Sequence, residues 1–299
     1  MTRPLDAASS FGGIEDPFAA YESSAIAIWP VPFERTVSYG TGTAAGPAAI
    51  LAASTQVELY DEELQSEPYR IGVATLPPFV PPAEDLGEAI EQIRQAARQH
   101  FTAGKVLLTL GGEHVLTIGP VRAARDVHGD IGVVQLDAHA DLRDTYEGTP
   151  WSHACVMRRL HEDGVPALAV GIRALSTEEG ELIRRQRLLT VWGYELDTLE
   201  PQALREHLDK LPEKVYLTFD IDYFDPSLVP ATGTPEPGGG RWWPTLQLLR
   251  EIFRTKQVVG MDVVELAPVA GHPVSDFLTA RLVYKLISYW ADSNRQRRP

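Results

Sequence analysis

The stretch "IGVVQLDAHADLRD" (residues 131–144) joins an apolar run to three side chains of the kinds that bind metals. The apolar run is continuous rather than alternating, which is typical of a strand buried on both faces in a parallel sheet. Asp137, His139 and Asp141 follow at alternate positions, so in an extended backbone they leave the chain on one side. The stretch predicts a buried strand that ends in a metal site. The alternative is a polar turn at the surface.

Strand-like and helix-like segments alternate through the rest of the chain, and this alternation indicates an α/β fold with a mainly parallel sheet covered on both sides. Ser176, with Glu179 three residues later, forms the capping-box pattern of a helix start. We expect strands at 24–31, 105–110, 131–136, 167–173, 188–192, 214–219 and 257–264. We expect helices at 46–54, 83–104, 116–126, 151–163, 176–186, 201–210, 244–254 and 275–290.

No linker-like segment divides the 299 residues, so we expect one domain over residues 24–299. Residues 1–23 are irregular, and "FGGIEDPF" predicts an N-terminal arm rather than a core element. The stretch 225–240 is long and rich in proline and glycine. A long loop inside a compact domain is usually functional, so we expect this one to serve the site.

Polar side chains follow four of the expected strands, and the carboxyl ends of parallel strands meet at one edge of a sheet. Four carboxylates gathered there with two imidazoles would repel one another strongly in the absence of cations. A pair of metal ions would supply the positive charge. Oxygen ligands with imidazole and no thiolate suit Mn²⁺ best, while Zn²⁺, Co²⁺, Ni²⁺ and Fe²⁺ stay open. The six candidate ligands are His114, Asp137, His139, Asp141, Asp220 and Asp222.

The formal net charge of −14 and the sequence pI of about 5.0 argue against a nucleic-acid partner and suit a cationic substrate. No apolar run approaches the length of a membrane span, so we expect no membrane partner. Cys155 is the only cysteine, and no internal disulfide is possible. With no signal peptide, this favours a cytoplasmic protein. Cys155 itself is expected to be a small buried residue rather than a nucleophile.

Six motifs in order resemble the ureohydrolases, the arginase and agmatinase family, and most closely its agmatinase branch. The segment "VPFERTVSYGTGTAAGPAAI" (31–50) also resembles the family's N-terminal part. The six motifs are "GGEH" (111–114), "DAHADLRD" (137–144), "SHACVMRR" (152–159), "FDIDYFDP" (219–226), "TGTPEPGG" (232–239) and "DVVE" (262–265).

The resemblance implies a three-layer α/β/α fold, a homo-trimer or hexamer, and two Mn²⁺ ions per chain. It assigns His153 to proton transfer and Glu265 to binding the substrate guanidinium, and on chemical grounds we expect Asp141, besides binding a metal, to orient the attacking hydroxide. A carboxylate fits the paired N–H groups of a guanidinium, and an imidazole titrates near neutral pH. One ion would be held by His114, Asp137, Asp141 and Asp220, and the other by Asp137, His139, Asp220 and Asp222.

The loop "LRDTYEGTPWS" (142–152) bears on the substrate. It has no asparagine to hold an α-carboxylate, and its acids and aromatics suit an ammonium group better. Asp144 and Trp151 are the substrate-binding candidates in this loop, beside Tyr146 and Glu147, although Arg143 could serve a carboxylate. We expect agmatine, cleaved to urea and putrescine. N1-aminopropylagmatine leads the alternatives, followed by 4-guanidinobutyrate, arginine, formimidoylglutamate and a catalytically silent homologue that binds or regulates.

Overall fold

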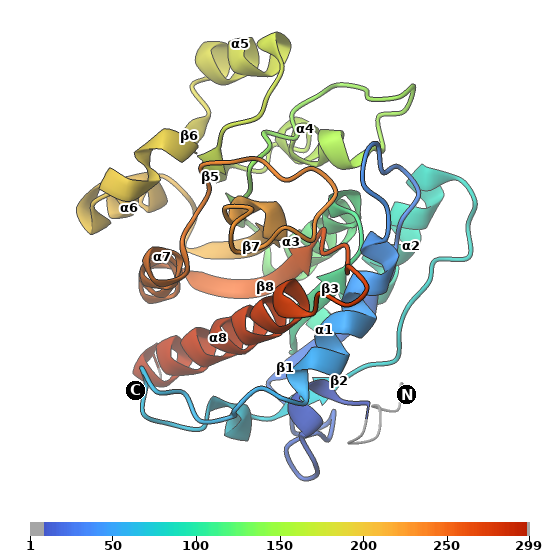
Figure 1. Ribbon diagram of the computed structural model, residues 1–299, viewed down its shortest axis with the longest axis vertical. Helices are drawn as coiled ribbons and strands as arrows, with labels where there is room; N and C mark the ends of the chain where they lie inside the picture. The colour runs from blue at the N-terminus through green and yellow to red at the C-terminus, as the bar shows by residue number, and fades with distance from the viewer. Residues whose placement is uncertain (1–8, 298–299) are drawn as a thin grey trace.

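The computed structural model describes residues 9–297, which form one eight-stranded sheet whose strand pairs are all parallel (Figure 1). The order across the sheet is β2-β1-β3-β8-β7-β4-β5-β6. The strands are β1 (Ile26–Val31), β2 (Val73–Thr75), β3 (Val106–Gly111), β4 (Gly132–Leu136), β5 (Ala167–Ile172), β6 (Leu189–Trp192), β7 (Lys214–Asp220) and β8 (Gln257–Val264).

Helices cover both faces of the sheet and bury a separate apolar cluster against each. In Figure 1, α1 and α8 cross in front of the sheet while α2 and α3 lie behind it. Buried side chains of α1, α6, α7 and α8 share one cluster, and those of α2, α3, α4 and α5 share the other. The helices are α1 (Gly46–Ser54), α2 (Leu86–Thr102), α3 (Ile118–His128), α4 (Val156–Glu162), α5 (Thr177–Gln186), α6 (Pro201–Leu208), α7 (Trp242–Thr255) and α8 (Val274–Arg297).

The expected fold class, three layers with a parallel sheet, is confirmed. Continuous apolar strands need cover on both faces, and the two helical layers provide it. The capping box of Ser176 and Glu179 is present at the start of α5. Strand β2 was not expected, because three residues are too few to show a period. The helix expected at 151–163 begins only at Val156, since a 3₁₀ turn over His153–Cys155 precedes it.

The four strands that carry the candidate site residues are neighbours in the middle of the sheet, in the order β3-β8-β7-β4. Because all strand pairs are parallel, their carboxyl ends lie at the same edge. Loops after these strands therefore meet over a single area of the molecule.

Residues 9–23, expected as an arm outside the core, instead contribute to it. Phe11 is fully buried and Ile14 nearly so, and both belong to the cluster beneath α1. The backbone N–H of Phe11 donates to Thr75 Oγ1 at 2.9 Å, which joins this segment to β2. The boundary at residue 24 stays a prediction, but the segment before it packs like a core element.

Arg173, directly after β5, secures the loop 225–240. Its guanidinium donates to the carbonyl oxygens of Gly171 (3.0 Å), Asp222 (2.8 Å) and Glu236 (2.8 Å). One side chain thus joins the ends of β5 and β7 to the long loop.

Among the described residues, no helix has both the length and the apolar character that a membrane span requires.

Candidate metal centre

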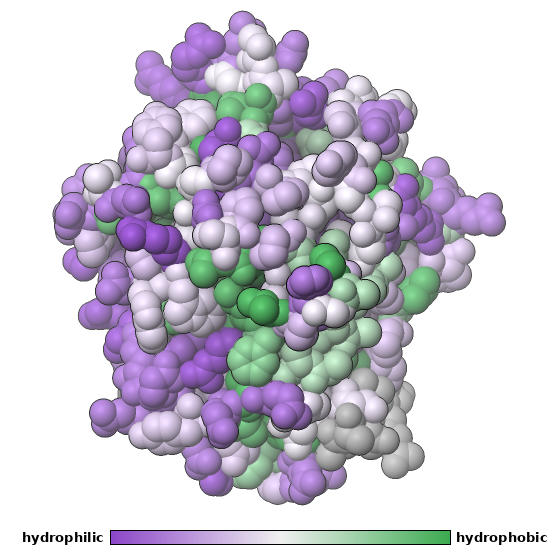
Figure 2. All heavy atoms as spheres, viewed as in Figure 1, coloured by the Kyte–Doolittle hydropathy of each residue, from purple (hydrophilic) through white to green (hydrophobic). Residues whose placement is uncertain are grey.

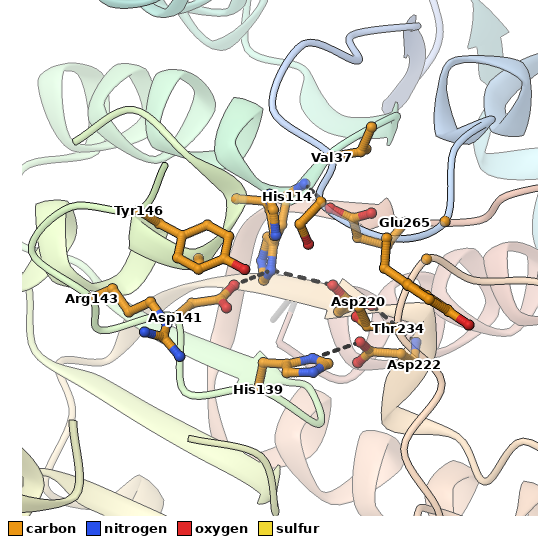
Figure 3. Close-up of a pocket in the computed structure, with 16 residues that line it drawn as sticks. Val37, His114, His139, Asp141, Arg143, Tyr146, Asp220, Asp222, Thr234 and Glu265 are labelled. Carbon is orange, nitrogen blue, oxygen red and sulfur yellow. Dashed lines mark hydrogen bonds and ion pairs between the residues drawn. The ribbon is translucent and has the colours of Figure 1, made fainter. Parts of the chain in front are cut away.

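Five of the six predicted ligands line one pocket at the carboxyl edge of the sheet (Figure 3). The sixth, Asp137, is fully buried beside them. The six come from the turn after β3, the segment after β4, and the end of β7. The fold thus unites side chains that are up to 108 positions apart, from His114 to Asp222 (222 − 114).

The first group of ligands surrounds His114. Its Nδ1 atom lies 3.0 Å from Asp141 Oδ2, 3.1 Å from Asp137 Oδ2 and 3.5 Å from Asp220 Oδ2. All four side chains are buried. His114, Asp137 and Asp141 each offer one atom to a common point.

The second group surrounds His139, whose Nδ1 lies 2.8 Å from Asp222 Oδ2 and 3.8 Å from Asp137 Oδ1. Asp137 belongs to both groups and points one carboxylate oxygen at each. Such a shared carboxylate is the arrangement that holds two metal ions close together.

The hydrogen bonds of His114 test whether a cation fits. Thr218 donates its only hydroxyl proton to Asp262 Oδ1 at 2.6 Å. The 2.8 Å contact between Thr218 Oγ1 and His114 Nε2 must therefore use the proton of Nε2. Nδ1 is left with a lone pair, is buried and has no hydrogen-bond partner. A lone pair that faces three carboxylates is a site for a cation, so the residues fit a metal.

The electrostatics of the cluster lead to the same conclusion. Burial, with the charges of Asp141 and Asp222, raises the pKa of Asp137 to about 7. Burial also raises the pKa of Asp220 well above its usual range. Burial alone would lower the pKa of His139, but Asp222 raises it to about 10. The protein alone would therefore gather protons here, and divalent cations would satisfy the same carboxylates without them.

A buried polar row supports the ligands from below. Gln135, Thr218, Asp262 and Thr109 lie side by side on β4, β7, β8 and β3, and all are fully buried. Gln135 Nε2 donates to Asp137 Oδ2 at 2.8 Å, and Asp262 fixes His114 through Thr218. Groups that orient the ligands of a metal in this way strengthen its binding. Gln135 lies in the stretch quoted first and Asp262 in the motif at 262–265, but sequence reasoning gave neither of them a role.

Two site residues have strained backbones. Asp141 has φ 52° and Glu265 has φ 66°, in the left-handed region that residues other than glycine rarely adopt. Such strain clusters at functional sites. In Glu265 the turn after β8 brings the side chain back over the sheet edge, where Oε1 accepts from the backbone N–H of His114 at 2.6 Å.

A pocket of about 160 Å³ opens above the ligands and contains both other predicted catalytic residues, His153 and Glu265. Burial lowers the pKa of His153, and the negative charge of Asp141 opposes this. Burial raises the pKa of Glu265 well above its usual range. The remaining wall comes from Val37, Ser38, Tyr39, Gly40, Arg143, Tyr146, Ala154, Gly233 and Thr234.

Two predicted substrate-binding residues do not line this pocket. Asp144 is exposed and pairs with Arg159 at 2.7 Å. Trp151 is half-buried, and the guanidinium of Arg122 lies 5.6 Å from its ring centroid. In this structure Arg159 of α4 pairs with Asp144 and Arg122 of α3 packs against Trp151, so the substrate-binding roles of these two residues stay predictions.

The loop 142–152 instead turns Arg143 and Tyr146 toward the pocket (Figure 3). Arg143 lies 5.0 Å from the ring centroid of Tyr146, and its Nε is 3.9 Å from Glu179 Oε2.

Cys155 is buried, and burial raises the pKa of its thiol to about 11, which does not suit a nucleophile.

A parallel sheet between two helical layers, with two imidazoles and four carboxylates gathered at its carboxyl edge, is the arrangement expected of a metal-dependent hydrolase. The family model described as the arginase family matches residues 24–288. The chain belongs to the arginase family, and it is a ureohydrolase of that family.

The curated relatives differ in the substrates that they are named for. An N(1)-aminopropylagmatine ureohydrolase of Synechocystis sp. is 42% identical, with 94% of each chain covered. An agmatinase of Pyrococcus horikoshii is 33% identical, covering 86% of this chain and 89% of its own. Among solved structures, an agmatine ureohydrolase of Thermoplasma volcanium superposes with a TM-score of 0.85 at 27% identity, covering 100% of this chain and 97% of its own.

Proposed function

We propose that the protein hydrolyses N1-aminopropylagmatine to urea and spermidine, with agmatine as a second substrate. The observation that carries the substrate is the set of relatives. Two relatives of this name, from Synechocystis sp. and Thermus thermophilus, are 42% and 38% identical, while the agmatinases of Pyrococcus horikoshii and Bacillus anthracis are 33% and 34% identical. This support favours the longer substrate over agmatine, which the sequence alone led us to expect first.

The chemistry of the pocket agrees with a polycation. Arg143 is the only arginine or lysine among the lining residues, and it is already engaged by Tyr146 and Glu179. A substrate carboxylate would have no other strong donor there, and an unpaired buried carboxylate binds poorly. The exposed ring of Tyr39 offers a face for an ammonium group and its methylenes.

The six ligands would hold two divalent ions, which we propose to be Mn²⁺. When bound, such a pair lowers the pKa of a water to near neutrality, so that it can attack the guanidinium carbon. Asp141 has a strained backbone, and its carboxylate faces His114 within the cluster. This carboxylate orients the attacking water. Glu265 accepts the guanidinium N–H groups, and His153 gives a proton to the departing amine.

A substrate panel tests the proposal. We expect kcat/KM for urea release to be highest with N1-aminopropylagmatine, lower with agmatine, and lowest with arginine and 4-guanidinobutyrate. Preference for either carboxylate-bearing compound would contradict the pocket argument. Preference for agmatine would return the assignment to agmatinase.

His153→Ala should lower kcat by about 10²–10⁴-fold while the metal content stays unchanged.

A further inference from the structure

The hydroxyl of Thr36 lies between the proposed proton-transfer residue and a buried carboxylate. The backbone N–H of His153 donates to Thr36 Oγ1 at 3.2 Å, and His153 Nδ1 lies 3.5 Å from the same oxygen. On its other side, Thr36 donates to Glu113 Oε2 in a short hydrogen bond. The three residues come from the loop after β1, the end of β3 and the start of the 3₁₀ turn before α4.

Glu113 is fully buried, and its carboxylate receives three donors from one loop. Oε1 accepts from the backbone N–H groups of Arg35 and Thr36, the latter at 2.6 Å, while Oε2 accepts from the Thr36 hydroxyl. Burial raises the pKa of Glu113 to about 7. Above that pH its carboxylate is ionised and can only accept hydrogen bonds. The single hydroxyl proton of Thr36 is therefore committed to Glu113, and lone pairs of Thr36 Oγ1 face His153.

We propose that Glu113 and Thr36 are positioning residues that hold His153 as the tautomer protonated on Nδ1. The Nδ1–H group then donates to Thr36 Oγ1, and the hydroxyl of Ser152, whose Oγ lies 3.4 Å from the same Nδ1, can turn to accept as well. Nε2 keeps its lone pair and is free to take up a proton and return it to the leaving amine. The catalytic meaning of this arrangement rests on the role proposed for His153 above.

The charge of Glu113 decides which tautomer is held. In Glu113→Gln, the amide oxygen would stay where it accepts from the two backbone N–H groups, since the amide nitrogen cannot accept there. The amide nitrogen would then occupy the place of Oε2 and donate to Thr36 Oγ1. The Thr36 proton would turn toward His153 Nδ1, and the opposite tautomer, protonated on Nε2, would be favoured.

Kinetics of matched threonine variants give the first test. Thr36→Val keeps the shape and removes both contacts to His153, and we expect kcat to fall about tenfold, a part of the whole acid–base contribution. KM and metal content should change by less than about twofold. Thr36→Ser should restore kcat. Thr43→Val is the control, because Thr43 lies in the same N-terminal part of the chain and is buried, but its hydroxyl has no hydrogen-bond partner. Wild-type kcat in Thr36→Val would overturn the proposal.

Imidazole ¹⁵N NMR gives a second test that does not depend on activity. The Zn²⁺-loaded protein would be measured at about pH 9, above the pKa of about 7 to which burial raises Glu113, with the His153 signals assigned by their loss in His153→Gln. We expect the Nδ1-protonated form in the wild type and the Nε2-protonated form in Glu113→Gln. The same tautomer in both would overturn the proposal, even if Thr36→Val did not fold. Wild-type turnover in His153→Ala would instead remove the proposed catalytic role while leaving the tautomer result to stand on its own.

Discussion

At the residue scale, Asp137 is the residue shared by the two groups of candidate metal ligands. It is fully buried, and its two oxygens point separately at His114 and His139. We expect Asp137→Asn to lower the metal content from about two ions per chain toward none. Asp222→Asn touches the second group only, so one ion should remain. Metal analysis of dialysed protein checks this, and equal losses in the two variants would contradict a shared ligand.

Glu265 is the second residue for which the structure makes a sharp prediction. Its Oε1 is already held by the His114 N–H, so Glu265→Gln keeps that contact and removes only the charge. A hydrogen bond to a charged group contributes about 1.5–3 kcal/mol. We therefore expect kcat/KM to fall about 10- to 100-fold with both metals retained. Wild-type kinetics in this variant would show that another carboxylate binds the guanidinium.

At the element scale, α8 is secured by a buried ion pair. Lys285, fully buried in the helix, donates to Asp61 Oδ1 at 3.0 Å and lies 3.2 Å from Glu62 Oε1. Lys285→Met leaves Asp61 without its partner, which typically costs about 3–5 kcal/mol of unfolding free energy. Lys256→Met is the matched control, since buried Lys256 donates to a backbone carbonyl of Leu211. Urea unfolding should show a clearly smaller loss in the control.

The same pair gives the stability of the protein a defined dependence on pH. Burial opposes the charge of Asp61, but hydrogen bonds from the Leu64 N–H and Lys285 outweigh it and lower the pKa of Asp61. A carboxyl group whose pKa is lower in the folded protein stabilises the fold at pH values above its pKa in the unfolded chain, which is near 4. That stabilisation is lost as the pH falls through the lower folded pKa. Urea unfolding over a pH series should show a shallower acid loss in Lys285→Met, and parallel curves would contradict this.

At the scale of the whole molecule, an apolar area on one face bears on self-association. Figure 2 shows hydrophobic side chains gathered in the middle of the view, where α1 and the beginning of α8 lie in Figure 1. Val274 and Phe277, in the first turn of α8, are 68% and 44% exposed, and Val269 is 47% exposed. Surfaces that contact other proteins often carry exposed apolar side chains gathered in one area. We propose that it joins copies of this chain in the expected homo-trimer or hexamer.

A charge-insertion pair tests that proposal. We expect Val274→Lys with Phe277→Lys to lower the molecular mass measured by light scattering while the circular dichroism is kept. Tyr194→Lys is the control, because Tyr194 is 81% exposed on a separate 3₁₀ segment and should not change the mass. A monomeric wild type, or a double variant of unchanged mass, would contradict the proposal.

Much of this protein is determined by short stretches of its sequence. The period of the apolar residues selects strands or helices, and the ligand types sit within a few positions of each strand end, as in 137–141 and 220–222. These signals are local, so the fold class and a set of candidate metal ligands could be predicted without coordinates, and the six motifs added the resemblance to the ureohydrolases. The relatives added the longer substrate as the better supported one.

Tertiary structure alone decided how these pieces meet. Strand β8 is the last strand in the sequence, yet in the sheet it lies between β3 and β7. This order brings Glu265 to the backbone N–H of His114. The same packing turns Asp144 toward Arg159 and places Thr36 between Glu113 and His153. Such contacts join positions far apart in the chain through the shape of the core. No local period or motif encodes them, because their energy exists only once the layers have packed.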